Sequence, residues 1–261
     1  MCRTVLNMQD LTVAYQGKPV VKDINLIVKE QEIVCVVGES GSGKSTLLKA
    51  SMRLLGQGGT VSKGSIHFWE QDLLGMSQEQ LRKIRGAEMG TIFQNCKDSL
   101  CPVRTIGEQL YECVTQHGKI SRKIVEEKAV KLLEKLHLTE EKRILESYPF
   151  ELSGGMNQRV GIMMALIMQP SLLLADEPTS SLDVTVQADV VKAMTQMRNE
   201  TGTAILMVTH NMGVAAHMAD RIVVMKEGQI VELGNTKEIL SHPAKEYTRN
   251  LIRAVPRLNR R

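Results

Sequence analysis

The sequence predicts an α/β protein with a mainly parallel central sheet. Three short apolar runs, at residues 33–37, 172–175 and 204–208, have the length and composition of strands that are buried on both faces. A segment with helical spacing, residues 186–200, separates the last two runs, which is the order of a βαβ unit. With 43% hydrophobic residues in 261, the chain can bury a core as one compact unit with subdomains.

Two antiparallel strand pairs are predicted outside the parallel run. Residues 5–15 and 20–32 alternate apolar and polar side chains on either side of the Gly17-Lys18-Pro19 turn. Residues 221–225 and 229–233 flank a short turn that contains a glycine, which is typical of a hairpin. The first pair places a small β region ahead of the central sheet.

The middle third of the chain is predicted to be mainly helical. Apolar residues recur at helical spacing over residues 126–138 and 160–168, and a helix is also predicted at residues 46–55. The longest apolar run, residues 162–168, is far shorter than the roughly 20 residues that cross a bilayer. The first ten residues lack the basic and apolar regions of a secretory signal. We therefore expect a chain that does not span a membrane.

Charge and cysteine content exclude several classes of protein. The formal net charge is +4, and residues 249–261 carry five arginines and no acid, so the remainder of the chain is 4 − 5 = −1. Such a neutral body does not favour a nucleic-acid-binding protein. The basic tail is either a solvated end or a contact for anionic lipid or an acidic partner. Five scattered cysteines without a CxxC pair predict free thiols rather than disulfides or a zinc site.

A glycine-rich segment carries the strongest chemical signal. Residues 38–45 read GESGSGKS, which matches the P-loop pattern GxxxxGK[ST] between the predicted strand 33–37 and the predicted helix 46–55. Inward backbone N–H groups would bind phosphate, Lys44 would reach the β and γ phosphates, and Ser45 would ligate Mg²⁺. The predicted nucleotide-binding residues here are Gly38, Glu39, Ser40, Gly41, Ser42, Gly43, Lys44, Ser45 and Thr46.

Two acids follow the apolar strand at residues 172–175. Asp176 at the carboxyl end of that strand is predicted to hold Mg²⁺, and Glu177 is predicted to polarise the attacking water. Phosphoryl transfer needs both a phosphate cradle and a metal-holding carboxylate, so the two motifs support each other.

A third segment, residues 152–159, reads LSGGMNQR and resembles the LSGGQ signature of ABC-type ATPases. Ser153 and two glycines would present a hydroxyl and bare amides at a helix N-terminus, which is a second phosphate-binding surface. The resemblance implies that Ser153, Gly154, Gly155 and Met156 close over ATP held by the P-loop of another cassette.

The resemblance extends over about residues 10–234 and implies further roles. Tyr15 would stack on adenine, Gln94 would touch Mg²⁺ and water, and His210 would contact the γ-phosphate. Asp183 would belong to the D-loop at the dimer interface. The implied fold is a RecA-like P-loop NTPase core with an antiparallel β subdomain and a helical subdomain inserted at about 94–167. The ATPase domain would span residues 1–248, followed by the basic tail at 249–261.

Finer similarities indicate the peptide/nickel importer branch of that family. They lie in residues 147–156, 182–188 and 220–225, in His242-Pro243 and in Tyr247-Thr248. The chain departs from this branch at Asn157, where Arg is usual, at Asn211, where Asp is usual, and over residues 95–102. No cysteine follows Cys113, so the iron–sulfur cysteine cluster of many peptide importers is absent, which favours a nickel or metallophore branch.

The resemblance implies the cofactors ATP and Mg²⁺ and a set of partners. These are a second ABC ATPase, related but distinct, two integral-membrane permease subunits and, indirectly, an extracellular solute-binding protein, with no nucleic acid. The chain would act peripherally, at the cytoplasmic face of the membrane. The alternatives are a cassette of another importer class and a soluble ABC ATPase that acts on nucleic acid or the ribosome. A binding-only regulatory cassette is disfavoured by Glu177 and His210.

Overall fold

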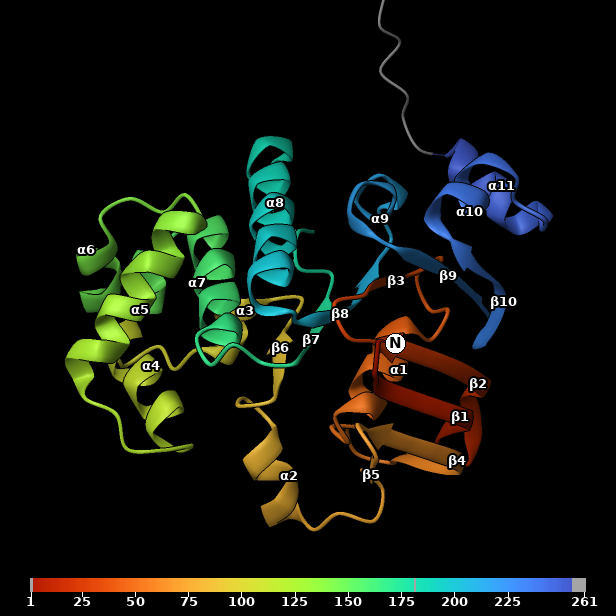
Figure 1. The fold of residues 1–261 in the computed structure, drawn as a ribbon, viewed down its shortest axis with the longest axis horizontal. Helices are drawn as coiled ribbons and strands as arrows, with labels where there is room; N and C mark the ends of the chain where they lie inside the picture. Colours follow the sequence, from red (N-terminus) through yellow and green to blue (C-terminus); the bar gives the residue numbers. More distant parts are fainter. Residues whose placement is uncertain (1, 181, 255–261) are drawn as a thin grey trace, which may run out of the picture. The chain divides into compact units, whose positions relative to one another are not determined.

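The computed structural model describes residues 2–180 and 182–254, and the chain divides into two compact units (Figure 1). The first unit comprises the chain up to Met76 and again from Ala204 onward. The second unit is the segment between them, Ser77–Thr203, which contains the whole region predicted as the helical subdomain.

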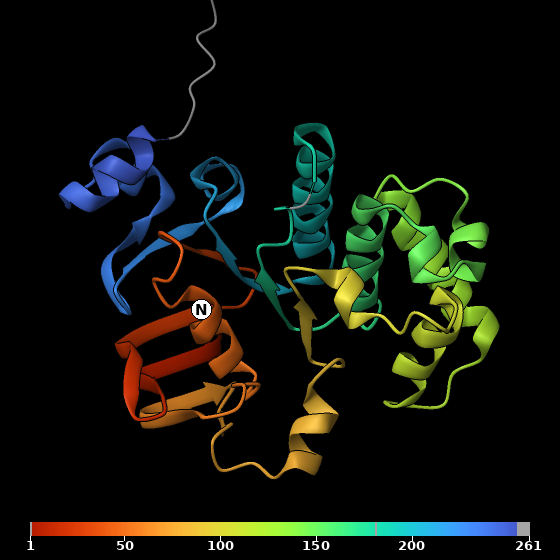
Figure 2. The ribbon, with the colours of Figure 1, turned by 180° about the vertical axis from the view of Figure 1, so that it is seen from behind.

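An antiparallel sheet of four strands forms one part of the first unit (Figure 2). Its order is β2-β1-β4-β5, with bounds Lys18–Lys29, Thr4–Tyr15, Gly59–Phe68 and Gln71–Asp72. The predicted first hairpin is confirmed, but its turn is only Gln16-Gly17, because Tyr15 pairs with Lys18. Both turn residues have positive φ, 50° and 78°, as a tight two-residue hairpin turn requires.

The first unit also holds four strands in the order β10-β9-β3-β8. Strand β3 (Ile33–Val37) is parallel to β8 (Ala204–Thr209) and to β9 (Arg221–Lys226). All five residues of β3 are buried, as the apolar run predicts. Strand β10 (Gln229–Asn235) pairs antiparallel with β9, so the second predicted hairpin is confirmed.

The helices of the first unit are α1 (Lys44–Ser51), α9 (Met212–Met218), α10 (Thr236–Ser241) and α11 (Glu246–Arg253). The helix predicted at 46–55 is wrong at its end, because Arg53 adopts a left-handed φ of 50°. Its guanidinium donates to the backbone oxygens of Leu73 and Met76, 3.0 and 2.7 Å away. The predicted tail boundary at residue 249 falls inside α11, and residues 255–261 lie outside the described chain.

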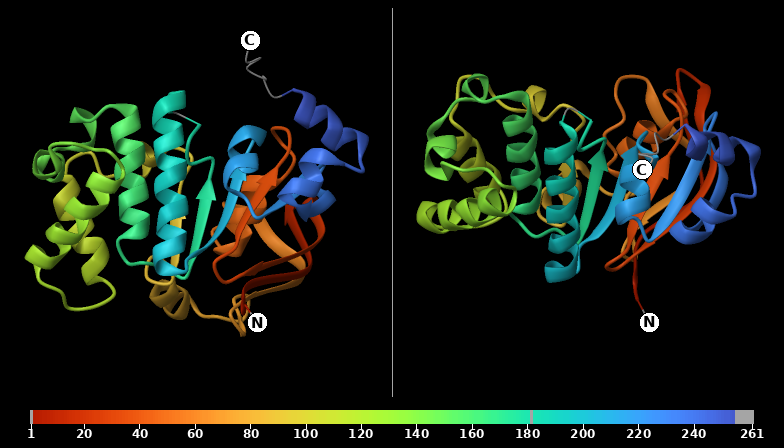
Figure 3. Two further views of the ribbon diagram at one scale, coloured as in Figure 1. Left: turned by 45° about the horizontal axis from the view of Figure 1, so that its top comes forward. Right: turned by 90° about the horizontal axis from the view of Figure 1, so that it is seen from above.

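The second unit combines two parallel strands with helices (Figure 3). Strand β6 (Met89–Ile92) pairs in parallel with β7 (Leu172–Asp176), the strand predicted at 172–175. The helices are α2 (Gln78–Ile84), α3 (Cys96–Ser99), α4 (Ile106–Thr115), α5 (Arg122–Lys135), α6 (Glu141–Glu146), α7 (Gly154–Leu166) and α8 (Val184–Thr201), with a 3₁₀ turn at Pro149–Glu151.

The helix predictions for this unit are confirmed in kind and corrected in their limits. Helix α5 begins before the predicted residue 126 because Ser121 caps it, its hydroxyl accepting from the N–H of Ile124. The helix predicted at 160–168 overlaps the later part of α7, which begins earlier, at Gly154, and ends earlier, at Leu166. Within residues 2–180 and 182–254, no helix has the length and apolarity needed to cross a membrane.

Candidate functional site

The predicted P-loop in the first unit closes around the side chain of Lys44. Lys44 is 5% exposed, and its ammonium donates to the backbone oxygens of Gly38 at 2.8 Å and Glu39 at 2.7 Å. It also donates to the hydroxyl of Ser42 at 3.4 Å. The loop therefore holds a buried positive charge at the start of helix α1, with backbone oxygens as its neighbours.

The loop depends on two glycines for its path. A Cβ atom at Gly38 would lie 2.2 Å from the backbone oxygen of Met225, so any side chain there forces a collision. Gly43 has φ of 96° and is the N-cap of α1, a left-handed position that favours glycine. Helix α1, with Ser45 and Thr46 in its first turn, starts directly after the loop and leaves N-terminal amides there without a side-chain cap. Together with the Lys44 ammonium they fit a polyphosphate.

Two more predicted residues of the first unit lie near strand ends. Tyr15 is the last residue of β1 and is half-buried, with its ring against Gly59. His210 directly follows β8 and lines a cavity of about 270 Å³ together with Gly38, so the structure brings the predicted switch histidine and the P-loop to one cavity. Asn211 caps α9, accepting from the N–H groups of Gly213 and Val214, a role that Asn and Asp fill equally well.

The predicted acidic residues lie at the end of β7 in the second unit. Asp176 is 6% exposed, and Glu177 follows it with a left-handed φ of 46°. The side-chain amide of Gln94 donates to the carboxylate of Glu177 at 3.3 Å. This contact follows from the register, because β6 and β7 are parallel and Ile92 pairs with Ala175, two residues before each partner. The structure thus places Gln94 and Glu177, two of the three predicted catalytic residues, within hydrogen-bonding distance of each other.

The predicted signature residues lie at the N-terminus of α7. Ser153 is the N-cap, and its hydroxyl accepts from the N–H of Met156 at 3.2 Å. A Cβ atom at Gly154 would meet nothing within 4 Å, and one at Gly155 only the Leu182 side chain at 3.4 Å. The first turn of α7 is therefore open to an incoming group, and its amides fit an anion.

Two polar side chains hold the starts of helices α7 and α8. Asn157, the departure from the usual Arg, is 0% exposed, and its amide nitrogen lies 2.9 to 3.2 Å from the backbone oxygens of Pro149, Leu152 and Ser153. These hydrogen bonds stabilise the turn that precedes α7. Asp183 caps α8, accepting from the N–H groups of Thr185 and Val186; its predicted role between subunits stays a prediction.

Gln158 is a residue that sequence reasoning missed. It is 2% exposed, its side-chain oxygen accepts from the N–H of Cys96 at 3.3 Å, and its nitrogen donates to the backbone oxygens of Phe93 at 3.4 Å and Pro178 at 3.0 Å. Phe93 and Cys96 lie on the two sides of Gln94 in the segment after β6, and Pro178 directly follows Glu177 after β7. A polar residue early in an apolar helix was the only signal for this role.

Helices α3 and α7 pack closely where Gly161 contacts Cys96. A Cβ atom at Gly161 would lie 2.3 Å from the sulfur of Cys96, so the glycine makes room for the thiol. Burial raises the pKa of Cys96 to about 11, which keeps the thiol protonated at neutral pH. In the described part of the chain, no group of three or more His, Cys, Asp or Glu could hold a metal ion.

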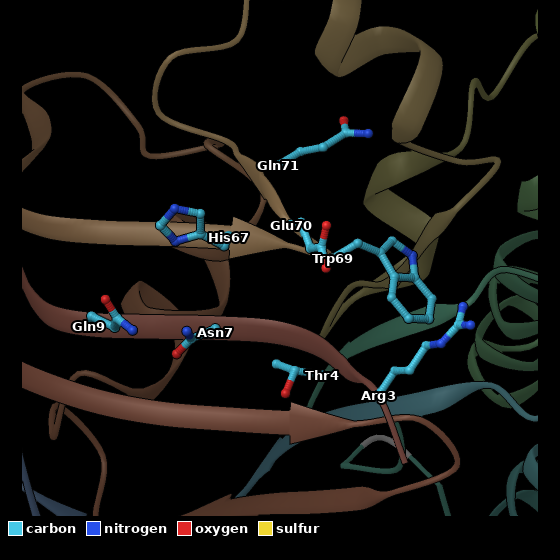
Figure 4. Close-up of a pocket in the computed structure, with 8 residues that line it drawn as sticks. All are labelled: Arg3, Thr4, Asn7, Gln9, His67, Trp69, Glu70 and Gln71. Carbon is cyan, nitrogen blue, oxygen red and sulfur yellow. The ribbon is translucent and has the colours of Figure 1, made fainter. Parts of the chain in front are cut away.

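A separate cavity of about 1110 Å³ lies over the antiparallel sheet of the first unit (Figure 4). It contains none of the predicted site residues. The side chains that line it come from β1 and the residue before it, from the end of β4, from the turn that follows and from the start of β5, namely Arg3, Thr4, Asn7, Gln9, His67, Trp69, Glu70 and Gln71.

Comparison with known proteins gives a consistent family. Residues 21–180 match the family model described as ABC transporter. The chain is 45% identical over 244 residues to a protein of Brucella melitensis named as a peptide import ATP-binding protein, covering 91% of this chain and 72% of the relative. It is 39% identical to the oligopeptide transport ATP-binding protein OppD of Bacillus subtilis, with 97% and 72% coverage.

A solved structure has the same fold. It is a dimeric ATP-binding cassette in a post-hydrolysis state, bound to ADP and Pi. It is 29% identical to this chain with a TM-score of 0.80, covering 88% of this chain and 98% of the other.

Proposed function

This chain belongs to the ABC transporter family and hydrolyses ATP to energise import, and from that premise we propose that its cargo is a peptide. The choice of peptide as the cargo goes beyond what the family alone shows. A single chain presents a P-loop closed on Lys44 and an open signature turn at Ser153, and its relatives with those motifs are named for peptide and oligopeptide import.

The residues of the first unit would bind the nucleotide. The P-loop amides and the Lys44 ammonium hold the phosphates, Tyr15 stacks on the adenine, and His210 contacts the γ-phosphate. These contacts orient the nucleotide and stabilise charge that develops on the transferred phosphoryl group.

The residues of the second unit would carry out the hydrolysis. Glu177 accepts a proton from the attacking water, and Gln94, already bonded to it, orients that water. The buried carboxylate of Asp176 fits a cation, and Asp176 and Gln94 would be the Mg²⁺ ligands that this unit supplies. When bound, Mg²⁺ neutralises charge on the β and γ phosphate oxygens.

The open signature turn would bind ATP from a second cassette. Because a Cβ atom at Gly154 would meet nothing within 4 Å, a phosphate from outside the chain can approach the backbone of Gly154 and Gly155. We propose a related but distinct second ATPase subunit and two integral-membrane permease subunits as partners, with an extracellular solute-binding protein acting through the permeases. The chain then works at the cytoplasmic face of the membrane.

The relatives favour peptide over nickel as the cargo. The two relatives reported above are named for peptide and oligopeptide import, whereas only the absent cysteine cluster favours the nickel branch. The decisive experiment reconstitutes the chain with its permeases and solute-binding protein in vesicles. ATP-dependent accumulation of a labelled short peptide is expected, and the Glu177→Gln variant should abolish it. Accumulation of Ni²⁺ without peptide would contradict the proposed cargo.

A mixing experiment tests the distinct partner. Lys44→Ala breaks the P-loop and Gly154→Asp breaks the signature, so a mixed homodimer would rebuild about one of its two sites from the intact halves. If the partner is a distinct subunit, mixing the two variants restores no ATPase activity. Recovery of activity without another cassette would show that the chain works as a homodimer.

A further inference from the structure

One peptide group of the P-loop is held at both of its ends. The backbone oxygen of Gly38 accepts a hydrogen bond from the Lys44 ammonium at 2.8 Å. The N–H of Glu39, which belongs to the same peptide group, donates to the hydroxyl of Tyr247 at 3.1 Å. A trans peptide is planar, so its C=O and N–H point in opposite directions and rotate together. Tyr247 therefore fixes the orientation of the carbonyl that holds Lys44.

This peptide group needs such support because of the residue before it. Gly38 lacks a Cβ atom and has wide backbone freedom, so the peptide that follows it can rotate at low cost. Rotation would turn the carbonyl away from Lys44 and leave a buried ammonium with one fewer acceptor. A hydrogen bond to the opposite end of the peptide opposes that rotation.

Tyr247 is itself held in place by its surroundings. The ammonium of Lys226 lies 5.3 Å from the centre of the Tyr247 ring, within the range of a cation–π contact. The carboxylate of Glu232 accepts from the N–H groups of Ala244 and Lys245, at 2.7 and 3.1 Å, and from the hydroxyl of the buried Thr248. These bonds anchor the segment that carries Tyr247 to strand β10.

Helix α11 also lines the cavity that contains the P-loop glycine Gly38. Leu251 and Ala254 follow Tyr247 at positions i+4 and i+7, which share one face of a helix. Both line the cavity of about 270 Å³ that also contains Gly38 and His210. The C-terminal helix therefore presents a continuous face to the P-loop and to the predicted switch histidine.

We infer that Tyr247 is a positioning residue of the ATP site, which acts on the nucleotide through the Gly38–Glu39 peptide group and Lys44. The inference rests on the proposed function of the P-loop. It assigns part of ATP affinity to helix α11, outside every motif that defines the nucleotide site.

The first test removes a single oxygen atom from the full-length chain. Tyr247→Phe keeps the ring beside Lys226 but deletes the hydroxyl that accepts from Glu39. We expect the Kd for Mg·ATP to rise about three- to tenfold, the range of one neutral hydrogen bond. In the assembled transporter KM for ATP should rise by the same factor while kcat at saturating ATP stays within about twofold, because the lost contact supports binding. Tyr111→Phe in α4 is the matched control and should leave both values unchanged.

The second test separates positioning from general destabilisation. Exchange of the Glu39 amide hydrogen with solvent should become faster in Tyr247→Phe, whereas exchange across the strands of the first unit should stay as in the wild type. Unchanged ATP affinity together with unchanged Glu39 exchange would overturn the inference, as would an equal effect of Tyr111→Phe. If Lys44→Ala binds ATP as well as the wild type does, the proposed function fails instead, and the inference fails with it.

Discussion

The two units support their predicted catalytic loops by different means. In the first unit the P-loop is wound around the charged Lys44, which is held by backbone oxygens. In the second unit a neutral side chain, Gln158, bonds to the backbone on both sides of Gln94 and to the residue after Glu177. Hydrogen bonds to a charged group are stronger than neutral ones. We therefore expect the first unit to govern ATP affinity and the second to govern turnover.

The largest effect is expected from the reacting group of the second unit. Glu177→Gln keeps the size of the side chain but removes the carboxylate that accepts a proton from water. General base catalysis contributes about 10²- to 10⁴-fold, so kcat should fall about 1000-fold while the Kd for ATP stays within about twofold. Turnover and ATP binding are measured on the same preparation. Turnover near the wild-type rate would exclude Glu177 as the base.

The next effect is expected from the charge of the first unit. Lys44→Ala removes a buried ammonium that would bind two phosphates, and we expect the Kd for ATP to rise about 100-fold, as the loss of charged hydrogen bonds predicts. Lys49→Ala in the same helix is the control, because Lys49 is exposed and should leave the Kd unchanged. Equal effects of the two substitutions would show that general helix damage, and not the P-loop charge, sets the affinity.

The sequence predicted the elements whose signal is local. The run at Ile33–Val37 and the GESGSGKS segment after it are each readable from adjacent residues, and the structure places them as a buried strand and a loop around Lys44. The contact between Gln94 and Glu177 was not predicted, although both residues were. It depends on the pairing of β6 with β7, whose register the sequence does not display.

The remainder was beyond prediction because its partners are distant in the chain. Helix α1 ends before its predicted limit because Arg53 bonds to Leu73 and Met76, about 20 residues further on. Gln158 looked like an ordinary polar residue of a helix, since nothing near it indicates Phe93 or Pro178. Residue type is visible in a sequence, whereas burial and long-range partners are not.

A smaller effect is expected from Gln158, which touches neither substrate nor metal in the proposed mechanism. Gln158→Met keeps the length and volume of the side chain but removes its three hydrogen bonds to the backbone. We expect kcat to fall about tenfold with KM for ATP nearly unchanged, since the lost hydrogen bonds position the loops that carry Gln94 and Glu177 and do not contact the nucleotide. Gln196→Met on the exposed face of α8 is the control and should leave kcat unchanged.

A double variant shows whether Gln158 acts through Glu177. If it does, Gln158→Met should add little to the loss of kcat in Glu177→Gln, because the group that it positions is already gone. Fully multiplicative losses would show that Gln158 affects turnover by another route. A rise in the Kd for ATP comparable to the one expected for Lys44→Ala would instead contradict the division of labour between the units.

The smallest effect on activity is expected from packing behind the second unit. Gly161→Ala places a Cβ atom 2.3 Å from the Cys96 sulfur, so α3 and α7 must move apart. Overpacking of this kind costs about 1–3 kcal/mol. Alanine has a helix propensity up to about 1 kcal/mol better than glycine, so the net loss of unfolding free energy should be about 1 kcal/mol. The variant stays mostly folded at 25 °C, so kcat should change by no more than about twofold. Urea unfolding and ATPase assays measure the two effects.

Two companion variants identify the collision as the cause. In Gly161→Ala combined with Cys96→Ala, the sulfur is gone but the Cβ atom of residue 96 still lies 2.5 Å from the new methyl group, so the Gly161→Ala change should cost less unfolding free energy than it does beside Cys96, without becoming stabilising. Gly154→Ala in the same helix adds a methyl group where nothing lies within 4 Å, so it should leave the unfolding free energy unchanged or raise it. If Gly161→Ala were as stable as Gly154→Ala, the contact between α3 and α7 would have to be loose. Gln158 could not then hold the Gln94 segment in a fixed position, and the second unit would lose its proposed control of turnover.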